Sequence, residues 1–471
     1  MEKCAEKYLS KLGYSVNSNA LGIIQICDDW YANRVVKDFH KRVNLNGVEI
    51  KLKQLNMAKR CCADDANLCE VVSVCPENAS GSKEFIDGLL ERNRFDVQYR
   101  EQLEKTSALG SAGAYIYLKD AEAYVRVDGS TEIIGGEIRI NYVDADCIIP
   151  LTVVNKEITE CAFCASNIIG GKKHTVLVIF TTDNGMYKAE TVIFDEKGNY
   201  NENEVQVLQL GDVKPFAIMH NAEVNNLDDM MGYGLPKIYN SIPAFMIADL
   251  CYNLLFGDLS KADKLVFMNE LLACVQKDEF GRPYLTPQQK EIFILLGADY
   301  GGKLPEEKAL IQEYNPVIRV EDITKSFELA LSLISMSFGY GTKKYTFEDG
   351  RITTATEYIG TKQDSMQELN KQRKQAEQYI NDIVHAAMWF SNQFSRTGYD
   401  VSEALSIEFD DSYIIDRETE LERKRNDALS FDIPQLTIWY LMDAYNISEE
   451  DARKMVMSKA SEEDRDDDMT D

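Results

Sequence analysis

The chain has little positive charge for its size. Its 471 residues carry 51 Lys and Arg against 78 Asp and Glu, a formal net charge of −27. Neutralisation of phosphates by basic side chains supplies most non-specific affinity for nucleic acid, so a protein that grips DNA over its whole surface normally has the opposite balance. The composition argues against a general DNA-binding protein, and the chain as a whole is expected to repel DNA.

Long apolar runs are also missing. The longest, Ile242 to Phe256, is shorter than the roughly 20 residues that a membrane-spanning helix needs, and it contains Asp249. The N-terminal stretch MEKCAEKYLSKLGY has charges throughout and no apolar signal core. We therefore expect a cytosolic protein with no membrane partner. A hydrophobic content of 45% is still enough to bury a sizeable core.

Metal-binding patterns are lacking as well. Eleven cysteines are scattered and odd in number, which predicts reduced thiols. Cys161 and Cys164 form a CxxC, but their segment alternates like a strand and no second pair lies at zinc spacing. The histidines are isolated, without paired spacing: His40, His174, His220 and His385. We expect no metal site and no cofactor.

No catalytic motif is complete. Residues 297–304, GADYGGKL, fit G-x-x-x-x-G-K but end in leucine, where a phosphate loop needs a Ser or Thr hydroxyl for magnesium. Acid pairs are expected by chance in so acidic a chain, and turns or solvated faces explain them. These pairs are Asp144 with Asp146, Asp228 with Asp229, and Asp410 with Asp411. We expect no catalytic residues and no enzyme. The rival hypothesis is a metal-dependent nuclease using Asp410 and Asp411 or Asp144 and Asp146.

The apolar pattern of the first half predicts an α+β fold. Between Tyr115 and Ile218 it alternates as in strands, with DG, GG and DNG turns, which predicts a meandering antiparallel sheet. Asn46-Gly47 predicts a hairpin. Helical periodicity precedes the sheet in four stretches: Glu2 to Leu12, Ala20 to Phe39, QLNMAKRCCADDANLCEVV at 54–72, and Lys83 to Ser107.

The second half predicts two helices around an insertion. Helices are expected at Pro236 to Ser260 and at Val320 to Ser337, on either side of a mixed, turn-rich segment. A glycine-flanked loop then leads into a very long helix, Ala355 to Ser395, with a kink expected at Gly360. The remaining expected elements are a strand LSIEF, helices at Glu418 to Leu429, Ile433 to Asp443 and Glu449 to Lys459, and a disordered acidic tail, SEEDRDDDMTD.

Five stretches in this order resemble the portal (head-to-tail connector) proteins of tailed bacteriophages, of the type found in long-tailed phages of Gram-positive hosts. They are spread over most of the chain, and each is weak alone while the ordered set is strong. They are SALGSAGAYI, KPFAIMHNAEVNNLDDMMGYGLPKIYNSI, RVEDITKSFELALSLIS, FGYGTKKYTFEDGRITTATEYI and IEFDDSYIIDRETELER.

The resemblance implies an elongated α+β subunit with a set order of parts. A wing of helices plus antiparallel sheet precedes a two-helix stem that encloses a clip insertion, and a long bent helix and a helical crown follow. In this sequence the parts are the wing at 1–235, stem helix one at 236–262, the clip at 263–318, stem helix two at 319–337, the tunnel loop at 338–354, the long kinked wing helix at 355–398, and the return strand, crown and acidic tail at 399–471.

The resemblance also implies a function and partners. Twelve copies would form a ring at one capsid vertex, a virion location reached by assembly in the host cytoplasm. Double-stranded DNA would pass through the ring during packaging and ejection. The implied partners are the terminase large subunit (the packaging ATPase), scaffold and major capsid protein, and a head-completion or adaptor protein. A second rival hypothesis is a different virion ring, such as an adaptor or baseplate hub.

Two sets of site residues follow. In the expected tunnel loop, Lys343, Lys344 and Arg351 offer a thin cationic collar to DNA, while Tyr345 and Phe347 anchor the loop on neighbouring subunits; the plainer hypothesis is a surface turn with solvated charges. In the expected clip, partner-docking contacts are Asp278, Glu279, Phe280, Arg282 and Tyr284.

A second basic cluster comprises Lys37, Lys41, Arg42, Lys51, Lys53, Lys59 and Arg60. This cluster could meet an acidic neighbour or DNA, or be an ordinary mixed surface. The same holds for Lys371, Arg373 and Lys374.

Overall fold

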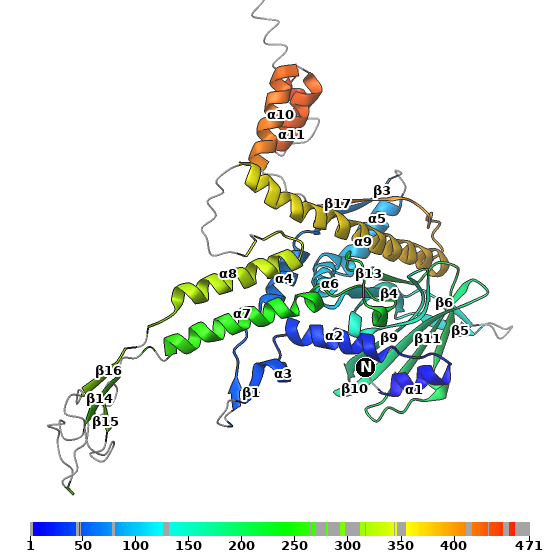
Figure 1. The fold of residues 1–471 in the computed structure, drawn as a ribbon. Coiled ribbons are helices and arrows are strands. Elements are labelled where there is room, and N and C mark those ends of the chain that lie inside the picture. The colour runs from blue at the N-terminus through cyan, green and yellow to red at the C-terminus, as the bar shows by residue number, and fades with distance from the viewer. Residues whose placement is uncertain are drawn as a thin grey trace, which may run out of the picture.

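The computed structural model is an α+β chain, as the apolar pattern predicts (Figure 1). A body of helices and sheets carries a projecting pair of antiparallel helices with a small sheet at their far end, and two short helices stand at the top of the view. The structure describes residues 3–43, 47, 49–77, 81–125, 131–260, 262, 265–269, 279–280, 293–296, 311–315, 317–342, 344–345, 355–410, 417–431, 433–445 and 452–456.

The helices before the sheets are shorter than predicted. The stretch expected as one helix from Ala20 to Phe39 is broken near Asn33, whose φ is +55°, and that from Lys83 to Ser107 is broken at Arg94, with φ +49°. Neither residue is a glycine, so no simple sequence signal marks these turns. The elements are α1 (Lys3–Lys11), α2 (Ser18–Tyr31), α3 (Lys37–His40), β1 (Lys41–Val43), β2 (Glu49–Lys51), α4 (Met57–Ala66), β3 (Val71–Pro76), α5 (Ser82–Arg92) and α6 (Phe95–Leu109).

The strand region folds as a meander plus a second, separate sheet. The five-stranded meander has the order β12-β11-β10-β9-β8, a smaller sheet has the order β13-β4-β7, and β5 pairs with β6. The strands are β4 (Ser111–Lys119), β5 (Glu122–Val125), β6 (Thr131–Ile134), β7 (Glu137–Asp144), β8 (Ile148–Val154), β9 (Glu157–Ile169), β10 (Lys172–Asp183), β11 (Met186–Phe194), β12 (Gln206–Gln209) and β13 (Phe216–His220).

The meander has a core on each face. Phe163 and Phe180 belong to the main core, which extends through β4, β13 and α9, whereas Ala162 and Leu177 belong to a second core under α1. Cys161 lies in the main core and Cys164 in the second. The two thiols of the CxxC therefore face opposite sides of β9 and cannot share a metal ion.

The helix pair and the long helix lie where the sequence predicts them. α7 (Lys237–Ser260) and α8 (Val320–Ser337) run antiparallel, and α9 spans Ala355–Ser395, continuous through Gly360. Between α7 and α8, β14 (Leu265–Asn269), β15 (Phe293–Leu296) and β16 (Ile311–Tyr314) form a sheet of order β15-β14-β16. The chain continues with β17 (Leu405–Phe409), which pairs with β3, then α10 (Arg417–Phe431), α11 (Pro434–Tyr445) and a helical segment at 452–456.

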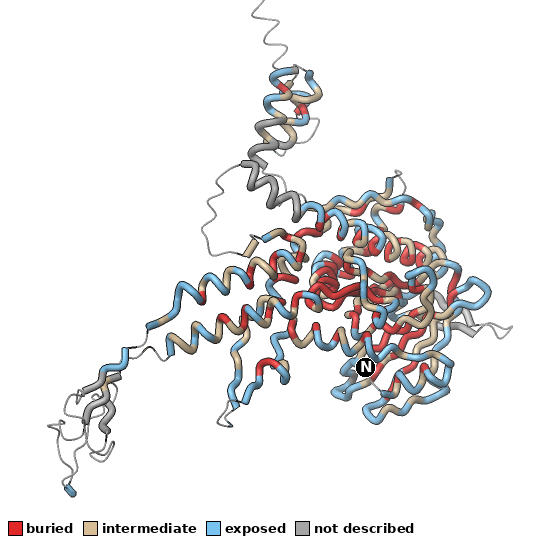
Figure 2. Tube along the Cα trace, viewed as in Figure 1, coloured by how far each residue is buried: buried red, intermediate tan, exposed pale blue. Residues whose placement is uncertain are grey.

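Burial is uneven along these helices. The middle and end of α9 are buried against the sheets, whereas α7 and α8 become progressively more exposed away from the body (Figure 2). Among the described helices, α7 alone is long and apolar enough to cross a membrane by length and composition. One such helix is weak evidence of a membrane span, and α7 packs along α8 and α2. Its central Asp249 is bonded to His40.

Two of the sequence stretches that carry the resemblance meet at a pair of glycines. Gly110, from SALGSAGAYI, has φ +87°, and a Cβ added to Gly234, from MMGYGLPK, would overlap the carbonyl oxygen of Gly110. The amide of Asn221 donates to that same oxygen at 2.9 Å, and the amide of Gly234 donates to Ser111 Oγ at 2.9 Å. Only glycines permit this crossing, which fixes the start of α7 on the sheet.

We therefore predict that Gly234→Ala lowers the free energy of unfolding by about 2–3 kcal/mol or more, because backbone rather than a flexible side chain must move. The matched control is Gly257→Ala in α7, where an added Cβ meets nothing within 4 Å. That variant gains helix propensity of up to about 1 kcal/mol. Urea unfolding of both variants checks the difference, and equal stabilities would contradict the close crossing.

Candidate functional site

A buried ionic cluster joins the root of the expected tunnel loop to three helices. At its centre Lys237, the first residue of α7, is fully buried. Its ammonium lies 2.9 Å from Asp65 of α4 and 2.9 Å from Glu368 of α9. Burial opposes the charge of Lys237, but the attraction of these two carboxylates outweighs it and raises the pKa of the ammonium. The lysine is therefore held as a cation in the protein interior.

The first residues after α8 are bonded to the same cluster. Tyr340 donates its hydroxyl to Asp65 Oδ1 at 2.7 Å, and Tyr345 donates to Asp64 Oδ2 at 3.0 Å. Burial, followed by nearby acidic groups, raises the pKa of both phenols, so they stay protonated donors. Two adjacent carboxylates of α4 thus each hold one tyrosine of the segment that leads into the loop.

Lys344 is folded onto this root. Its ammonium lies 3.5 Å from the ring centroid of Tyr340, and its backbone amide donates to Ser335 Oγ at 3.3 Å. Burial lowers the pKa of Lys344, while the charges of Asp64 and Asp65 partly oppose that shift. In the single chain, Lys344 therefore makes a cation–π contact instead of projecting freely. Tyr345 likewise bonds to α4 of its own chain, where we expected a neighbour.

Of the other predicted site residues, Glu279 and Phe280 are the two that the structure describes. Lys343, Phe347, Arg351, Asp278, Arg282 and Tyr284 lie outside the described residues, as do residues 297–304 and the acidic tail. Glu279 and Phe280 are both exposed, and Phe280 is 85% exposed. The collar of cations and the docking contacts therefore stay predictions.

Some of the acid pairs and histidines make contacts within the body. Asp144 pairs with Lys105 at 3.0 Å, and burial raises the pKa of Asp146. His40 Nε2 lies 3.0 Å from Asp249 Oδ2, and its Nδ1 accepts from the amide of Val36. Across the described residues, no three His, Cys, Asp or Glu side chains gather as a possible metal site.

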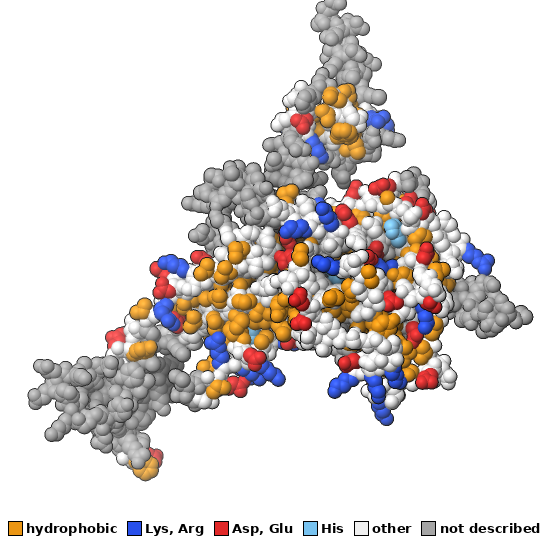
Figure 3. All heavy atoms as spheres, turned by 45° about the vertical axis from the view of Figure 1, so that its right-hand side comes forward, with side chains coloured by type: hydrophobic (Ala, Val, Ile, Leu, Met, Phe, Trp, Pro, Cys, Tyr) orange, Lys and Arg blue, Asp and Glu red, His pale blue; other side chains and the backbone are white. Residues whose placement is uncertain are grey.

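Exposed apolar side chains line the helix pair (Figure 3). On α7, Ile247 and Leu254 are 42% and 49% exposed, and on α8, Leu329 and Met336 are 62% and 56% exposed. Positions 247, 250 and 254 share one face of α7, and positions 329, 333 and 336 share one face of α8. We call these the α7 stripe (Ile247, Leu250, Leu254) and the α8 stripe (Leu329, Leu333, Met336). Exposed apolar faces of this kind are typical of interaction surfaces.

Comparisons with known proteins give distant structural likenesses. No protein-family model and no curated protein matches the chain. A chain from the neck of an empty GTA (gene transfer agent) particle, computed with C6 symmetry, matches with a TM-score of 0.36 and 13% identity, over 78% of this chain and 84% of that one. One from the neck of a native GTA particle, computed with C12 symmetry, matches with a TM-score of 0.34 and 12% identity, over 85% and 89%. TM-scores below 0.5 do not establish a shared fold.

Sequence patterns drew attention to the segment after α8 but missed the cluster that holds its first residues. Asp64, Asp65, Lys237 and Glu368 are far apart in the sequence, and none stands out in a chain with 129 charged residues, the 51 basic and 78 acidic ones. One signal was available. Lys237 directly follows Pro236 at the start of an apolar helix, where a lysine is unfavourable beside the helix dipole unless it has acidic partners.

We predict that Lys237→Met lowers the free energy of unfolding by about 3–5 kcal/mol, because Asp65 and Glu368 are left buried without their cation. The matched control is Lys371→Met. Lys371 pairs with the same Glu368 at 3.3 Å, but its side chain is 60% exposed, so the expected loss is below about 1 kcal/mol. Equilibrium urea unfolding checks both, and similar losses for the two variants would show that the buried pairs are not the stabilising element.

Proposed function

We propose that the chain is a portal subunit: copies of it close into a ring at one capsid vertex, and double-stranded DNA passes through the central channel. The observation that carries this proposal is the helix pair α7–α8, which projects from the body with exposed apolar stripes on both helices. Its support includes the order of parts along the chain, with a small sheet between the helices and a loop and a long helix after them.

The two stripes suit a ring contact. In a closed ring every copy uses two different faces, one for each neighbour. The α7 stripe of one copy packed on the α8 stripe of the next would cover apolar side chains that the single chain leaves exposed. Rotation about one axis repeats this same contact between every pair of neighbouring copies.

The channel dimensions support the same proposal. If one helix from each of twelve copies lines the channel, twelve helices spaced about 10 Å apart have axes on a circle roughly 38 Å across. Subtracting about 10 Å for the thickness of a helix leaves a lumen near 28 Å, which is wide enough for hydrated duplex DNA. A chain with a net charge of −27 gives walls that repel phosphates. DNA can then slide through without adhering.

The remaining roles belong to the same proposal. The subunit is not an enzyme; the terminase large subunit supplies the packaging energy and docks at the clip around Glu279 and Phe280. Scaffold and major capsid protein meet the ring during assembly in the host cytoplasm, and a head-completion or adaptor protein binds it afterwards. Lys343, Lys344 and Arg351 form a cationic collar in the assembled channel, where Lys344 would have to leave Tyr340.

Negative-stain imaging and native mass spectrometry of the purified chain test the ring. We expect rings with a central hole, and we expect Leu254→Glu and Leu329→Glu each to shift the chain to monomers, because a charge is then buried in the apolar contact. Leu12→Glu, at a 46% exposed leucine on the distant N-terminal helix region, is the control and keeps the rings. A monomeric wild type that cleaves DNA with magnesium would instead favour the nuclease.

The collar has a separate test. In particles assembled with Lys343→Ala/Lys344→Ala subunits, we expect less packaged DNA to be retained, because the channel loses two cations per copy. Lys344→Ala alone removes the contact with Tyr340 and leaves Lys343 in place, so it separates the effect of that contact from the effect of the collar. Quantifying encapsidated DNA checks both variants. Retention equal to that of the wild type in the double variant removes the collar.

A further inference from the structure

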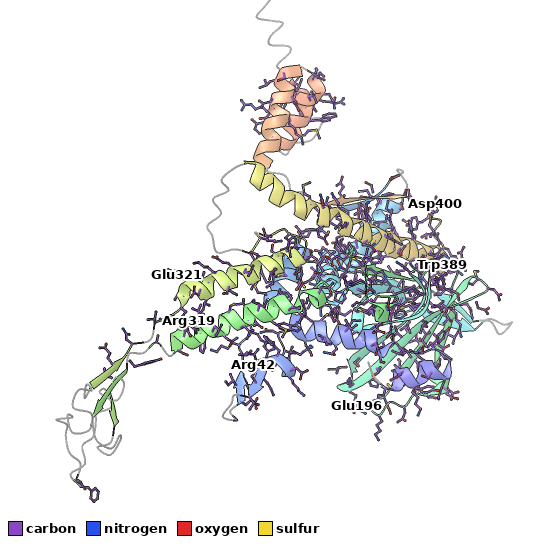
Figure 4. All side chains as sticks on the ribbon, viewed as in Figure 1. Arg42, Glu196, Arg319, Glu321, Trp389 and Asp400 are labelled. Atoms are coloured by element: carbon purple, nitrogen blue, oxygen red, sulfur yellow. The ribbon has the colours of Figure 1, made fainter. Side chains whose placement is uncertain are left out.

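A cationic hairpin is attached to the side of α7. The strands β1 and β2 are exposed at every residue, and Lys41 lies directly opposite Lys51 in their register. Arg42 belongs to the same hairpin (Figure 4), and its guanidinium lies 5.3 Å from the ring centroid of Phe39. Within the described part of the chain, Lys41, Arg42 and Lys51 have no acidic side chain at ion-pair distance. We call this element, the paired residues 41–43 and 49–51, the basic hairpin.

Three side chains of α7, those of Asp249, Asn253 and Phe256, hold the residues that flank the basic hairpin. Asp249 accepts from the amide of Leu55 at 2.8 Å and bonds to His40, so it holds both ends of the hairpin segment. Asn253 accepts from the amide of Lys53 at 2.8 Å and donates to its carbonyl at 2.7 Å. The ammonium of Lys53 lies 3.3 Å from the ring centroid of Phe256. The hairpin is therefore positioned by the helix pair.

The face of α7 that holds the hairpin adjoins the α7 stripe. Asp249, Asn253 and Phe256 form one row along the helix, and the stripe lies about a third of a turn away around it. A helix packed on the α7 stripe would therefore lie beside the basic hairpin. The hairpin would contact the end of that helix that lies at the same position along the axis of the helix pair.

That position is fixed by two contacts between α7 and α8. Arg319 donates to both carboxylate oxygens of Asp258, at 2.9 and 3.0 Å, and Ser241 Oγ lies 2.8 Å from Ser337 Oγ. With α7 and α8 antiparallel between these points, the turn of α7 around Phe256 lies level with the first turn of α8. Figure 4 shows Arg319 and Glu321 at this end of the pair.

The first turn of α8 is acidic and open. Glu321 and Asp322 are both exposed, and Lys325 lies one turn further along the helix. In a ring every copy stands at the same height, so this turn of one copy comes level with the hairpin of the next. The partner that the hairpin fits best is therefore a second copy of this chain.

We propose that the basic hairpin binds the acidic first turn of α8 in the neighbouring copy, and that this charge contact sets the register of the apolar stripes. The proposal rests on the ring function above and adds a recognition element to it. Apolar stripes alone can slide along each other, whereas opposite charges at one end favour a single axial position and penalise others. The contact also gives the ring a dependence on salt.

A charge swap tests the contact in purified protein. Lys41→Glu/Lys51→Glu replaces two exposed lysines, so we expect a folded chain whose rings dissociate at a concentration at least about tenfold higher than wild type, by native mass spectrometry or sedimentation. Glu321→Lys/Asp322→Lys is expected to do the same. Combining all four substitutions restores the attraction between copies and returns the ring fraction toward wild type.

The outcomes separate this contact from the ring itself. Lys3→Glu/Lys7→Glu on α1 makes the same change in net charge and is expected to leave the rings intact. Unchanged rings in the hairpin variant, or no recovery in the four-fold variant, would overturn the contact while leaving the portal proposal standing. Intact rings with weaker binding of a fluorescent DNA duplex would show that the hairpin takes nucleic acid instead. If the wild type forms no rings, the portal proposal itself fails.

Discussion

The buried charge of Lys237 is the interaction on which the arrangement of the chain depends. One ammonium, fully removed from solvent, pairs with Asp65 of α4 and Glu368 of α9. Removing a cation from water costs several kcal/mol, which is offset only when its partners hold it in good geometry. Three elements from distant parts of the sequence must therefore come together at one point, and an arrangement that separates them leaves a bare charge in the core.

Asp65 extends this constraint to the residues that follow α8. Asp65 also accepts from Tyr340, and the adjacent Asp64 accepts from Tyr345, so the chain just after α8 is tied to α4 while α8 itself lies on α7. A displacement of α7 relative to α9 would disturb Asp65 and, through it, Tyr340. In a channel protein this would link the position of the loop to the arrangement of the outer helices, since one side chain serves both contacts.

The sequence predicts those parts of the fold that depend on local patterns. α8 and α9 have the predicted bounds and α7 begins within one residue of its own, because their apolar periodicity is long and uninterrupted. The predicted helical stretch ran to Val72, whereas Val71 and Val72 begin β3, whose partner β17 lies more than 300 residues further along the chain. The cluster could not be predicted either. Whether Lys344 projects or folds onto Tyr340 depends on Asp64 and Asp65, which no local pattern connects to the loop.

Charged side chains have different roles in the interior and on the surface of the molecule. In the interior, Asp249 has defined partners in His40 and in the amide of Leu55. Acidic side chains outnumber basic ones over the whole chain, so an exposed group of cations such as the basic hairpin is a local exception. Identical copies repel one another through their net charge. A specific contact between them must then combine apolar burial with a local reversal of sign, and the edge of α7 holds both side by side.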